Sequence, residues 1–301
     1  MFCHGQSIDN EVKFCYSWNV SIAMPKARYQ FGAVFFFLLI HAGVLGVLWT
    51  PLTISAPAWL AGCYFLRMFG VTAGYHRYFG HRSYKLGRAA QFALAFLAQS
   101  SAQKGVLWWA AHHRTHHRES DRERDIHSPA QRGFWWSHVG WVLSNEFDDY
   151  NPNSMQEFRQ FPEIGWLDRH HWVPTVVFGA LLALVGGWPA FLWGYIVSTV
   201  LLYHCTFAIN SLAHLWGERR FDTADESRNN FWLALITLGE GWHNNHHYSP
   251  GSCRQGERWW ELDVTYLVLK ALSWVGIVRD MRPFRGASVV TIPDRAFKAA
   301  R

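Results

Sequence analysis

Eight of the chain's 17 histidines fall into three tight clusters: His76 with His81, then His113, His116 and His117, then His243, His246 and His247. Imidazole is the commonest neutral metal ligand at physiological pH. A single ion takes about four to six ligands, so eight clustered imidazoles predict a pair of metal ions. Soluble di-iron proteins supply Glu and Glu-x-x-His from a four-helix bundle, whereas these clusters predict an all-imidazole ligand shell.

The spacing within each cluster supports shared coordination. In HRTHH (His113 to His117) and HNNHH (His243 to His247) the histidines stand at i, i+3 and i+4, which places three rings on one helix face. His76 and His81 are about 140° apart on a helix, so this pair needs a helix end or a bend between its members to face one centre. Surface histidines or a chance run would explain one cluster, but three clusters beside apolar tracts are harder to explain in that way.

The composition is typical of a membrane protein. Of the 301 residues, 50% are hydrophobic and 17% are aromatic, including 18 Trp. Tryptophan is enriched where a protein meets the headgroup region of a bilayer. The net charge of +6 comes without a continuous basic run or a nucleic-acid reading motif, so nucleic acid is not an expected partner. The five cysteines are scattered and contain no CxxC pair, which argues against a disulfide framework or a thiolate metal site.

Two long uncharged tracts predict four membrane-spanning helices arranged as two hairpins. The first hairpin, residues 31–75, begins with Phe31 to Thr50 and returns through Leu52 to Leu66. The second, residues 170–213, has room for two helices separated at Gly186 to Pro189. A helix of about 20 residues spans the hydrocarbon layer of about 30 Å. Buried helices of a large soluble protein are the alternative explanation of these tracts.

Apart from Arg67, which lies within the first hairpin, the basic residues lie on one side of the predicted spans. Neither hairpin turn contains Lys or Arg, whereas segments 1–30, 76–169 and 214–301 contain many. The positive-inside rule therefore places both termini and all three clusters on the cytoplasmic side. We expect an all-α integral membrane protein whose two longer cytosolic segments form a helical cap around a histidine-ligated dimetal centre. Ala89 to Ala111 is expected to be a single helix in the membrane interface, and Trp259 to Ile277 a further helix.

Five segments resemble the membrane fatty acyl desaturases of the stearoyl-CoA Δ9-desaturase type. They are GVTAGYHRYFGHRSY (Gly70 to Tyr84), HHRTHHRESD (His112 to Asp121), RGFWWSHVGW (Arg132 to Trp141), NSLAH (Asn210 to His214) and GEGWHNNHH (Gly239 to His247). The similarity extends from about Gly70 to Arg282. The three clusters without the intervening phrases would also admit membrane hydroxylases.

The resemblance implies an enzyme that uses O2 and two electrons at two iron ions to insert a cis double bond, at Δ9, into a saturated long-chain acyl thioester. Acyl-CoA is the form we expect first, before acyl-ACP or an acyl-lipid. A separate electron donor is expected, a ferredoxin, rubredoxin or cytochrome b5-like protein with its reductase, because the chain has no His-Pro-Gly-Gly haem motif. The alternatives are an alkyl hydroxylase or acetylenase on the same scaffold and, more weakly, a non-enzymatic metal-binding or metal-transport membrane protein.

The resemblance also implies which side chains bind iron. The nine implied ligands are His76, His81, His113, His116, His117, His214, His243, His246 and His247. Asn210, one helical turn before His214, is implied to reach one iron through a water molecule. His112 stands where relatives often have Asp, and we expect it beside the ligand set rather than in it.

A fatty acyl substrate needs a narrow apolar tunnel, because one methylene pair must be held near the oxidant while the others are kept away. Trp108, Trp109 and Trp242 lie beside the clusters and are candidate tunnel walls, although interfacial anchoring explains them equally well. Tyr64 and Met68 are one turn apart on the second predicted span. If the family arrangement holds, they lie at the closed end of the tunnel.

Overall fold

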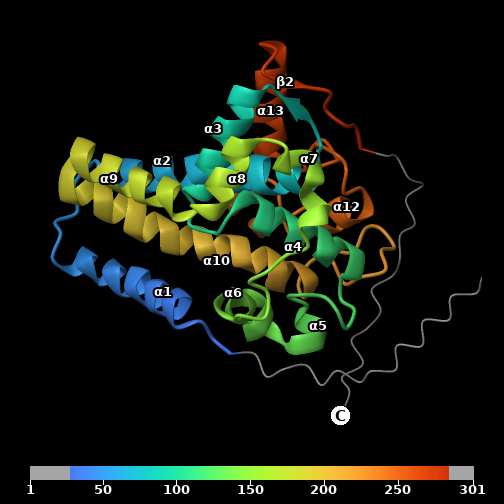
Figure 1. Cartoon of the computed structure of the whole chain (residues 1–301), viewed down its shortest axis with the longest axis horizontal. Helices are drawn as coiled ribbons and strands as arrows, with labels where there is room; N and C mark the ends of the chain where they lie inside the picture. Colours follow the sequence, from blue (N-terminus) through green and yellow to red (C-terminus); the bar gives the residue numbers. More distant parts are fainter. Residues whose placement is uncertain (1–27, 285–301) are drawn as a thin grey trace, which may run out of the picture.

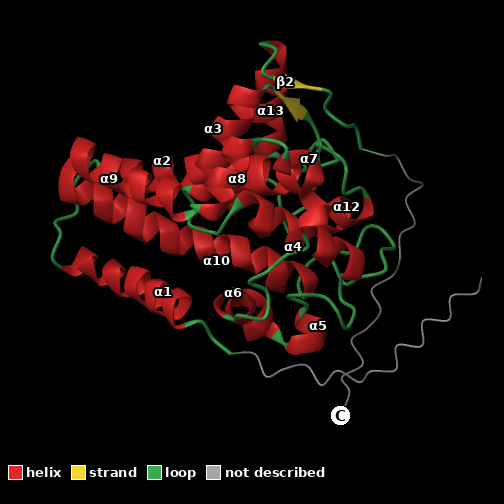
Figure 2. Ribbon diagram, viewed as in Figure 1, coloured by secondary structure: helices red, strands yellow, loops and turns green. Residues whose placement is uncertain are grey.

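The structure is a computed structural model that describes residues 28–284. Within this range most residues are helical, which confirms the helical part of the predicted fold class (Figures 1 and 2). Two short strands, β1 (Lys85–Leu86) and β2 (Val278–Arg279), pair antiparallel and were not predicted. The predicted cytosolic segment 1–30 lies outside the described residues except for its last three positions.

Four apolar helical segments pack into a bundle (Figure 1). They are α1 (Phe31–Gly43) with the 3-10 turn η1 (Val44–Leu48), α2 (Ala56–Phe69) with the π-helix η2 (Gly70–Gly80), α9 (Trp172–Pro189), and the π-helix η5 (Ala190–Val197) with α10 (Ser198–Ser211). Two continuous stretches in the described residues are long and apolar enough to cross a membrane, Phe31–Leu48 and Trp172–His214.

The longer of these stretches is folded back on itself at Gly187. This residue has φ 63° and ψ −157°, a backbone conformation that glycine adopts at little cost. Beyond it the chain runs antiparallel to α9. Two contacts show this: the Thr175 and Tyr195 hydroxyl oxygens lie 2.9 Å apart, and Gly179 faces Phe191. The break expected at Gly186 to Pro189 is therefore present, and it produces a helical hairpin.

The α1 helix is attached to the second hairpin along its later half. A β-carbon at Gly43 would lie 3.0 Å from Ile196, so the two segments are in close contact. Three imidazoles extend the connection: His41 Nε2 lies 3.0 Å from His204 Nε2, and His204 Nδ1 lies 3.0 Å from His138 Nε2. These hydrogen bonds join α1 to α10 and to the π-helical turn η3 (Trp136–Gly140).

The α2 helix is attached to the second hairpin by a buried arginine. Arg67 has no exposed surface, and its guanidinium donates to the Thr199 hydroxyl at 2.7 Å, to the Ser198 hydroxyl and to nearby backbone carbonyls. A buried cation is tolerated when its donors are satisfied, and five donors in a rigid fork suit several acceptors. Arg67 therefore fixes α2 against the start of α10.

The remaining elements form a cap over one end of the bundle (Figure 1). They are α3 (Arg88–Gln99), α4 (Val106–Glu119), α5 (Pro129–Arg132), α6 (Trp141–Leu143), η4 (Pro152–Met155), α7 (Gln156–Arg159), α8 (Pro162–Arg169), η6 (Leu212–His214), α11 (Phe231–Ile236), α12 (His243–Tyr248) and α13 (Val264–Trp274).

The prediction of a single helix over Ala89 to Ala111 was wrong. The chain turns between α3 and α4, where Ala102 and Lys104 have positive φ of 58° and 66°. The Asp168 carboxylate accepts hydrogen bonds from the first backbone N–H groups of α4, which lets a new helix begin at that point. The helix expected over Trp259 to Ile277 is confirmed in a shorter form as α13, for which Asp263 provides the N-cap.

Close packing of η2 on α3 generates a prediction about stability. A β-carbon at Gly70 would lie 2.9 Å from the backbone oxygen of Leu97, which cannot move without shifting α3. Gly70→Ala should therefore destabilise the protein by about 1–3 kcal/mol, visible as a lower Tm in detergent. Gly62, on α2, has open space around it, so Gly62→Ala is the matched control and should leave Tm unchanged or raise it. Equal Tm values for the two variants would contradict this packing.

Candidate metal centre

The structure gathers the nine predicted histidines where the cap meets the helix bundle. His76 lies in η2 and His81 directly follows it, three more lie on α4, His214 ends η6, and three lie on α12. The His76 and His81 rings are in edge-to-face contact, with centroids 4.9 Å apart. This pair meets because the π-helix ends at Gly80, so the helix end that its spacing required is present.

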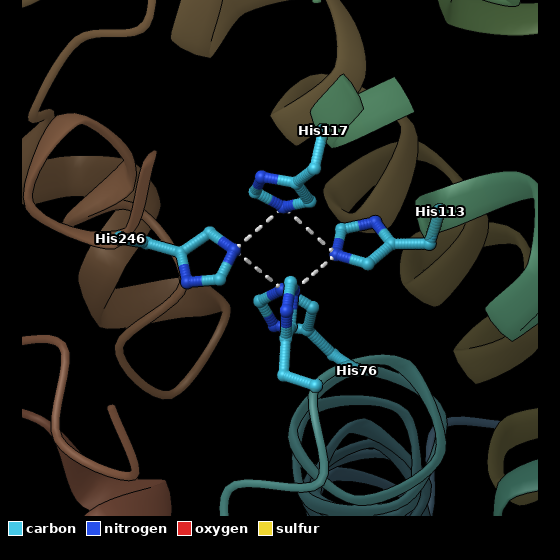
Figure 3. Close-up of side chains that lie close together, drawn as sticks. His76, His113, His117 and His246 are labelled. Carbon is cyan, nitrogen blue, oxygen red and sulfur yellow. Dashed lines mark hydrogen bonds between the residues drawn. The ribbon is translucent and has the colours of Figure 1, made fainter. Parts of the chain in front are cut away.

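The nine histidines divide into two groups. The first consists of His76, His81, His113, His117 and His246, and the second of His116, His214, His243 and His247. Within each group, one ring nitrogen per histidine lies within 4.8 Å of the ligand atoms of the others. Figure 3 shows the first group, in which the labelled rings from η2, α4 and α12 point toward a common centre.

The nitrogens of the first group approach one another closely. His117 Nε2 lies 3.1 Å from His113 Nε2 and 2.9 Å from His246 Nε2. His81 Nε2 lies 2.7 Å from His113 Nε2, and His76 Nε2 lies 2.9 Å from His246 Nε2. One cation at their centre could accept all five lone pairs at once, so the donor set fits a transition-metal ion.

Carboxylates lie behind four of the histidines. The Nδ1 atoms of His116, His214 and His247 lie 2.9, 2.8 and 2.8 Å from the carboxylates of Asp125, Asp121 and Asp225, and His76 Nδ1 contacts Glu240. Such a carboxylate holds the proton on Nδ1 and leaves the Nε2 lone pair free for a metal. Among the described residues, Nε2 of His116 and of His247 is buried without a hydrogen-bond partner. A bound ion would supply that missing partner, so the second group also fits a metal.

These carboxylates were not predicted from the sequence, where the clusters indicated only an all-imidazole ligand shell. They lie outside the imidazole set rather than within it. Asp121 and Asp125 come shortly after the second cluster, and Glu240 stands three residues before His243. The closeness of these acidic residues to the histidine clusters in the sequence was the signal that could have predicted the contacts. His112, by contrast, turns Nδ1 to the Trp108 carbonyl and belongs to neither group.

Burial keeps most of these imidazoles neutral. Burial, followed by the charges of neighbouring imidazoles, lowers the pKa of His113, His117 and His246 well below the usual value of 6.5. Burial also lowers the pKa of His247, to about 4. Burial opposes the ionised form of Asp121 as well, but its hydrogen bond with His214 brings the pKa of that carboxyl down to about 2. Neutral rings and ionised carboxylates are the protonation states that metal binding requires.

A cavity of about 650 Å³ reaches the first histidine group at His113, and Asn210 also lines it. Aromatic side chains such as Phe37 and Phe207 make up much of its wall. Trp108 and Trp109 line it, where the sequence analysis placed tunnel walls. The Trp109 ring stacks on that of His113 with centroids 4.9 Å apart, so the cavity wall and the first histidine group are in contact.

The other three side chains expected around a tunnel lie outside the lining of this cavity. The Tyr64 hydroxyl donates to the Ile236 carbonyl at 2.6 Å, and Met68 is buried in the bundle core. Trp242 donates its ring N–H to the Leu262 carbonyl at 2.9 Å. Asn210 lines the cavity one residue before Ser211, whose hydroxyl lies 2.9 Å from His138 Nδ1.

Fold and site together define a class of protein: a helical protein with two all-histidine groups that could each hold a metal ion, beside an apolar cavity. The chain belongs to the fatty acid desaturase family, whose family model matches residues 54–273. It is therefore an oxidoreductase, and the family is associated with membranes.

Named relatives support this assignment. An sn-2 palmitoyl-lipid 9-desaturase from Nostoc sp. (strain 36) is 38% identical over 237 residues, covering 76% of this chain and 81% of that protein. An sn-1 stearoyl-lipid 9-desaturase from Anabaena variabilis is 34% identical over 255 residues, covering 82% and 92%. An icosanoyl-CoA 5-desaturase from Limnanthes douglasii is 38% identical over 224 residues, covering 71% and 61%.

The contact between Asp225 and His247 predicts a loss of metal when the carboxylate is replaced. Asp225→Asn keeps the shape but weakens the hydrogen bond that fixes the His247 tautomer, and such changes cost about 10–100-fold in metal affinity. Metal content per chain after dialysis against a chelator should fall. Asp280→Asn, which removes an exposed ion pair with Lys85, is the control and should retain its metal. Retention by both variants would argue against a metal at the second group.

The low pKa values of the buried histidines predict acid sensitivity of the metal-free protein. When the folded pKa of a histidine lies below its unfolded value of about 6.5, the unfolded state binds more protons below that pH. The stability is therefore complete above about pH 6.5 and falls as the pH is lowered. His116 acts in the opposite direction, because Asp125 outweighs burial and raises its pKa. The Tm of metal-stripped protein should thus decrease from about pH 7 to 5, and an increase would contradict this account.

Proposed function

We propose that this protein is a di-iron fatty acyl desaturase that converts one CH2–CH2 unit of a saturated acyl chain into a cis double bond at Δ9. The observation that carries the proposal is the pair of histidine groups beside an aromatic cavity. A Δ9 position is favoured because two of the relatives described above are named 9-desaturases. The third is named a 5-desaturase, so the position of the double bond is part of what must be tested.

Two iron ions, one at each histidine group, are the cofactor that we propose. With O2 and two electrons they would supply the oxidant that removes hydrogen from an unactivated C–H bond. All nine histidines would serve as ligands, and Asn210 would act through a water molecule. We propose a ferredoxin, rubredoxin or cytochrome b5-like protein with its reductase as the electron source.

The chain's own residues would bind and orient the substrate. Trp109 stacks on His113 and forms part of the cavity wall, so a chain lying against it would present its methylenes beside the first group. The aromatic lining would exclude water and restrict the chain to one path, which makes the reaction regiospecific. The carboxylates of Asp121, Asp125, Asp225 and Glu240 would hold protons on the outer ring nitrogens and so keep the rings in place.

We further propose that the bundle crosses the membrane four times with the metal centre on the cytoplasmic side. Antiparallel packing of α9 with η5 supports a spanning hairpin. Exposed apolar side chains such as Leu38, Leu45 and Leu184, which are 59%, 56% and 82% exposed, would face lipid. The orientation follows from the distribution of Lys and Arg in the sequence.

Expression in a host that lacks unsaturated fatty acids tests the activity. With iron and an electron donor present, we expect new cis alkenes, and mass spectrometry of derivatised lipids should locate them at C9. His113→Ala removes one ligand of the first group and should abolish the alkene. His170→Ala is the control, because that ring lies outside both groups and bonds the Trp166 carbonyl.

The products separate the proposal from its rivals. A product that carries oxygen would identify a hydroxylase, and a triple bond would identify an acetylenase. Saturated lipids alone, in cells that make the protein and supply iron and donor, would remove desaturation from consideration.

A further inference from the structure

We infer that α13 is a membrane-surface helix whose apolar face lies at the boundary between lipid headgroups and acyl chains, and that α13 and α11 together anchor the cap to the bilayer. The inference rests on the membrane-spanning bundle proposed above and on no part of the desaturase chemistry. It moves part of segment 214–301, which the sequence analysis expected to be cytosolic, to the surface of the membrane.

An exposed apolar stripe runs along α13 and ends just beyond it. Leu267, Trp274 and Val275 are 54%, 77% and 71% exposed, and Val268 is 38% exposed. Ala271 is exposed as well. The spacing of these five positions places them on one face of a helix. Apolar side chains are unfavourable in water, so a face of this kind needs an apolar environment to cover it.

The apolar surface continues from α13 to α11 through a row of aromatic rings. On α11, Phe231 and Trp232 are 43% and 63% exposed. The Phe231 ring lies 6.3 Å from the Trp242 ring, and the Trp242 ring lies 5.6 Å from that of Trp260, centroid to centroid. Trp260 stands three residues before Asp263, the N-cap of α13. The two helices are therefore neighbours on one side of the cap.

Contacts with a proposed span identify lipid as the cover. Tyr64, on α2, donates its hydroxyl to the Ile236 carbonyl at the end of α11 at 2.6 Å. The Thr72 hydroxyl, on η2, lies 2.7 Å from the Thr265 hydroxyl at the start of α13. Phe65, beside Tyr64, is 47% exposed. Because Tyr64 lies within the span predicted from the sequence, the surface of α11 continues the lipid-facing surface of α2, where a water-soluble partner protein has no access.

The length and direction of α13 fit the membrane surface. Its 11 residues measure about 16 Å, roughly half of the hydrocarbon thickness of about 30 Å. In Figure 1, α13 runs across the direction of α9 and α10, so it would lie along the bilayer plane when those helices cross it. Lys270 is exposed at the edge of the apolar stripe. A lysine beside an apolar face that carries tryptophan is typical of helices at a lipid interface.

Spin-label accessibility in phosphatidylcholine nanodiscs tests the position of α13. Cys3 and Cys15 are replaced by serine, whereas the chain's other three cysteines are buried and should not react. One introduced cysteine at a time carries a nitroxide label. Its collision rate with oxygen, which concentrates in lipid, is compared with its collision rate with a neutral, water-soluble nickel chelate.

For Val268→Cys and Val275→Cys we expect a ratio of oxygen to nickel collisions several-fold higher than for Arg122→Cys. Arg122 is exposed between charged neighbours and is the reference for water. Ser273→Cys, on the other side of α13 from the stripe, is the matched control and should give a lower ratio than either stripe position. Equal ratios around the helix would contradict insertion of one face.

Two further results would overturn the inference. A ratio at Val268 and Val275 equal to that of Arg122 would place the stripe in water. Low collision rates with both reagents would show that protein covers it, either a second copy of the chain or another partner. Leu184→Cys, on α9 and 82% exposed, reports on the spanning bundle itself. A water-like ratio there would refute the proposed topology, whereas a lipid-like ratio there with water-like ratios on α13 would refute the inference alone.

Discussion

The whole arrangement depends on holding nine buried or half-buried imidazoles so that each directs a nitrogen at one of two points. Burial removes the rings from water, which makes protonation unfavourable and leaves a nitrogen lone pair available. The same burial would be costly for lone carboxylates, so Asp121, Asp125, Asp225 and Glu240 are each placed against a ring nitrogen. Each partner thus satisfies a polar group that would otherwise be unpaired.

The bundle supplies the fixed frame for these rings. Arg67 holds α2 against α10, and α2 continues into the π-helix that carries His76. Asp168 starts α4, the helix that supplies His113, His116 and His117. These four ligands therefore lie on elements that are attached to the protein core by buried or half-buried hydrogen bonds, so their positions do not depend on a flexible loop.

Local patterns could be predicted from the sequence, and contacts between distant segments could not. The rings on α4 and α12 share a face because the i, i+3 and i+4 spacing belongs to one helix. His214 has no such pattern and came from the family resemblance. The contact of Asp225 with His247 joins residues 22 positions apart, and the chain between them has no period that would reveal it. The break between α3 and α4 depends on Asp168, which lies 61 positions beyond Leu107. The break was not predicted because the apolar pattern of a segment does not indicate a helix cap that is supplied by a distant residue.

The first histidine group joins His76 to His246, which are 170 positions apart in the chain. Such a group can form only after nearly the whole described chain has been synthesised and packed, because closing so long a loop precedes the gain from the contact. An ion bound there would stabilise the native state by mass action, to the extent that it binds the folded chain more tightly than the unfolded one. The amount of correctly assembled protein in a cell should therefore depend on the supply of its metal at the time when the chain folds.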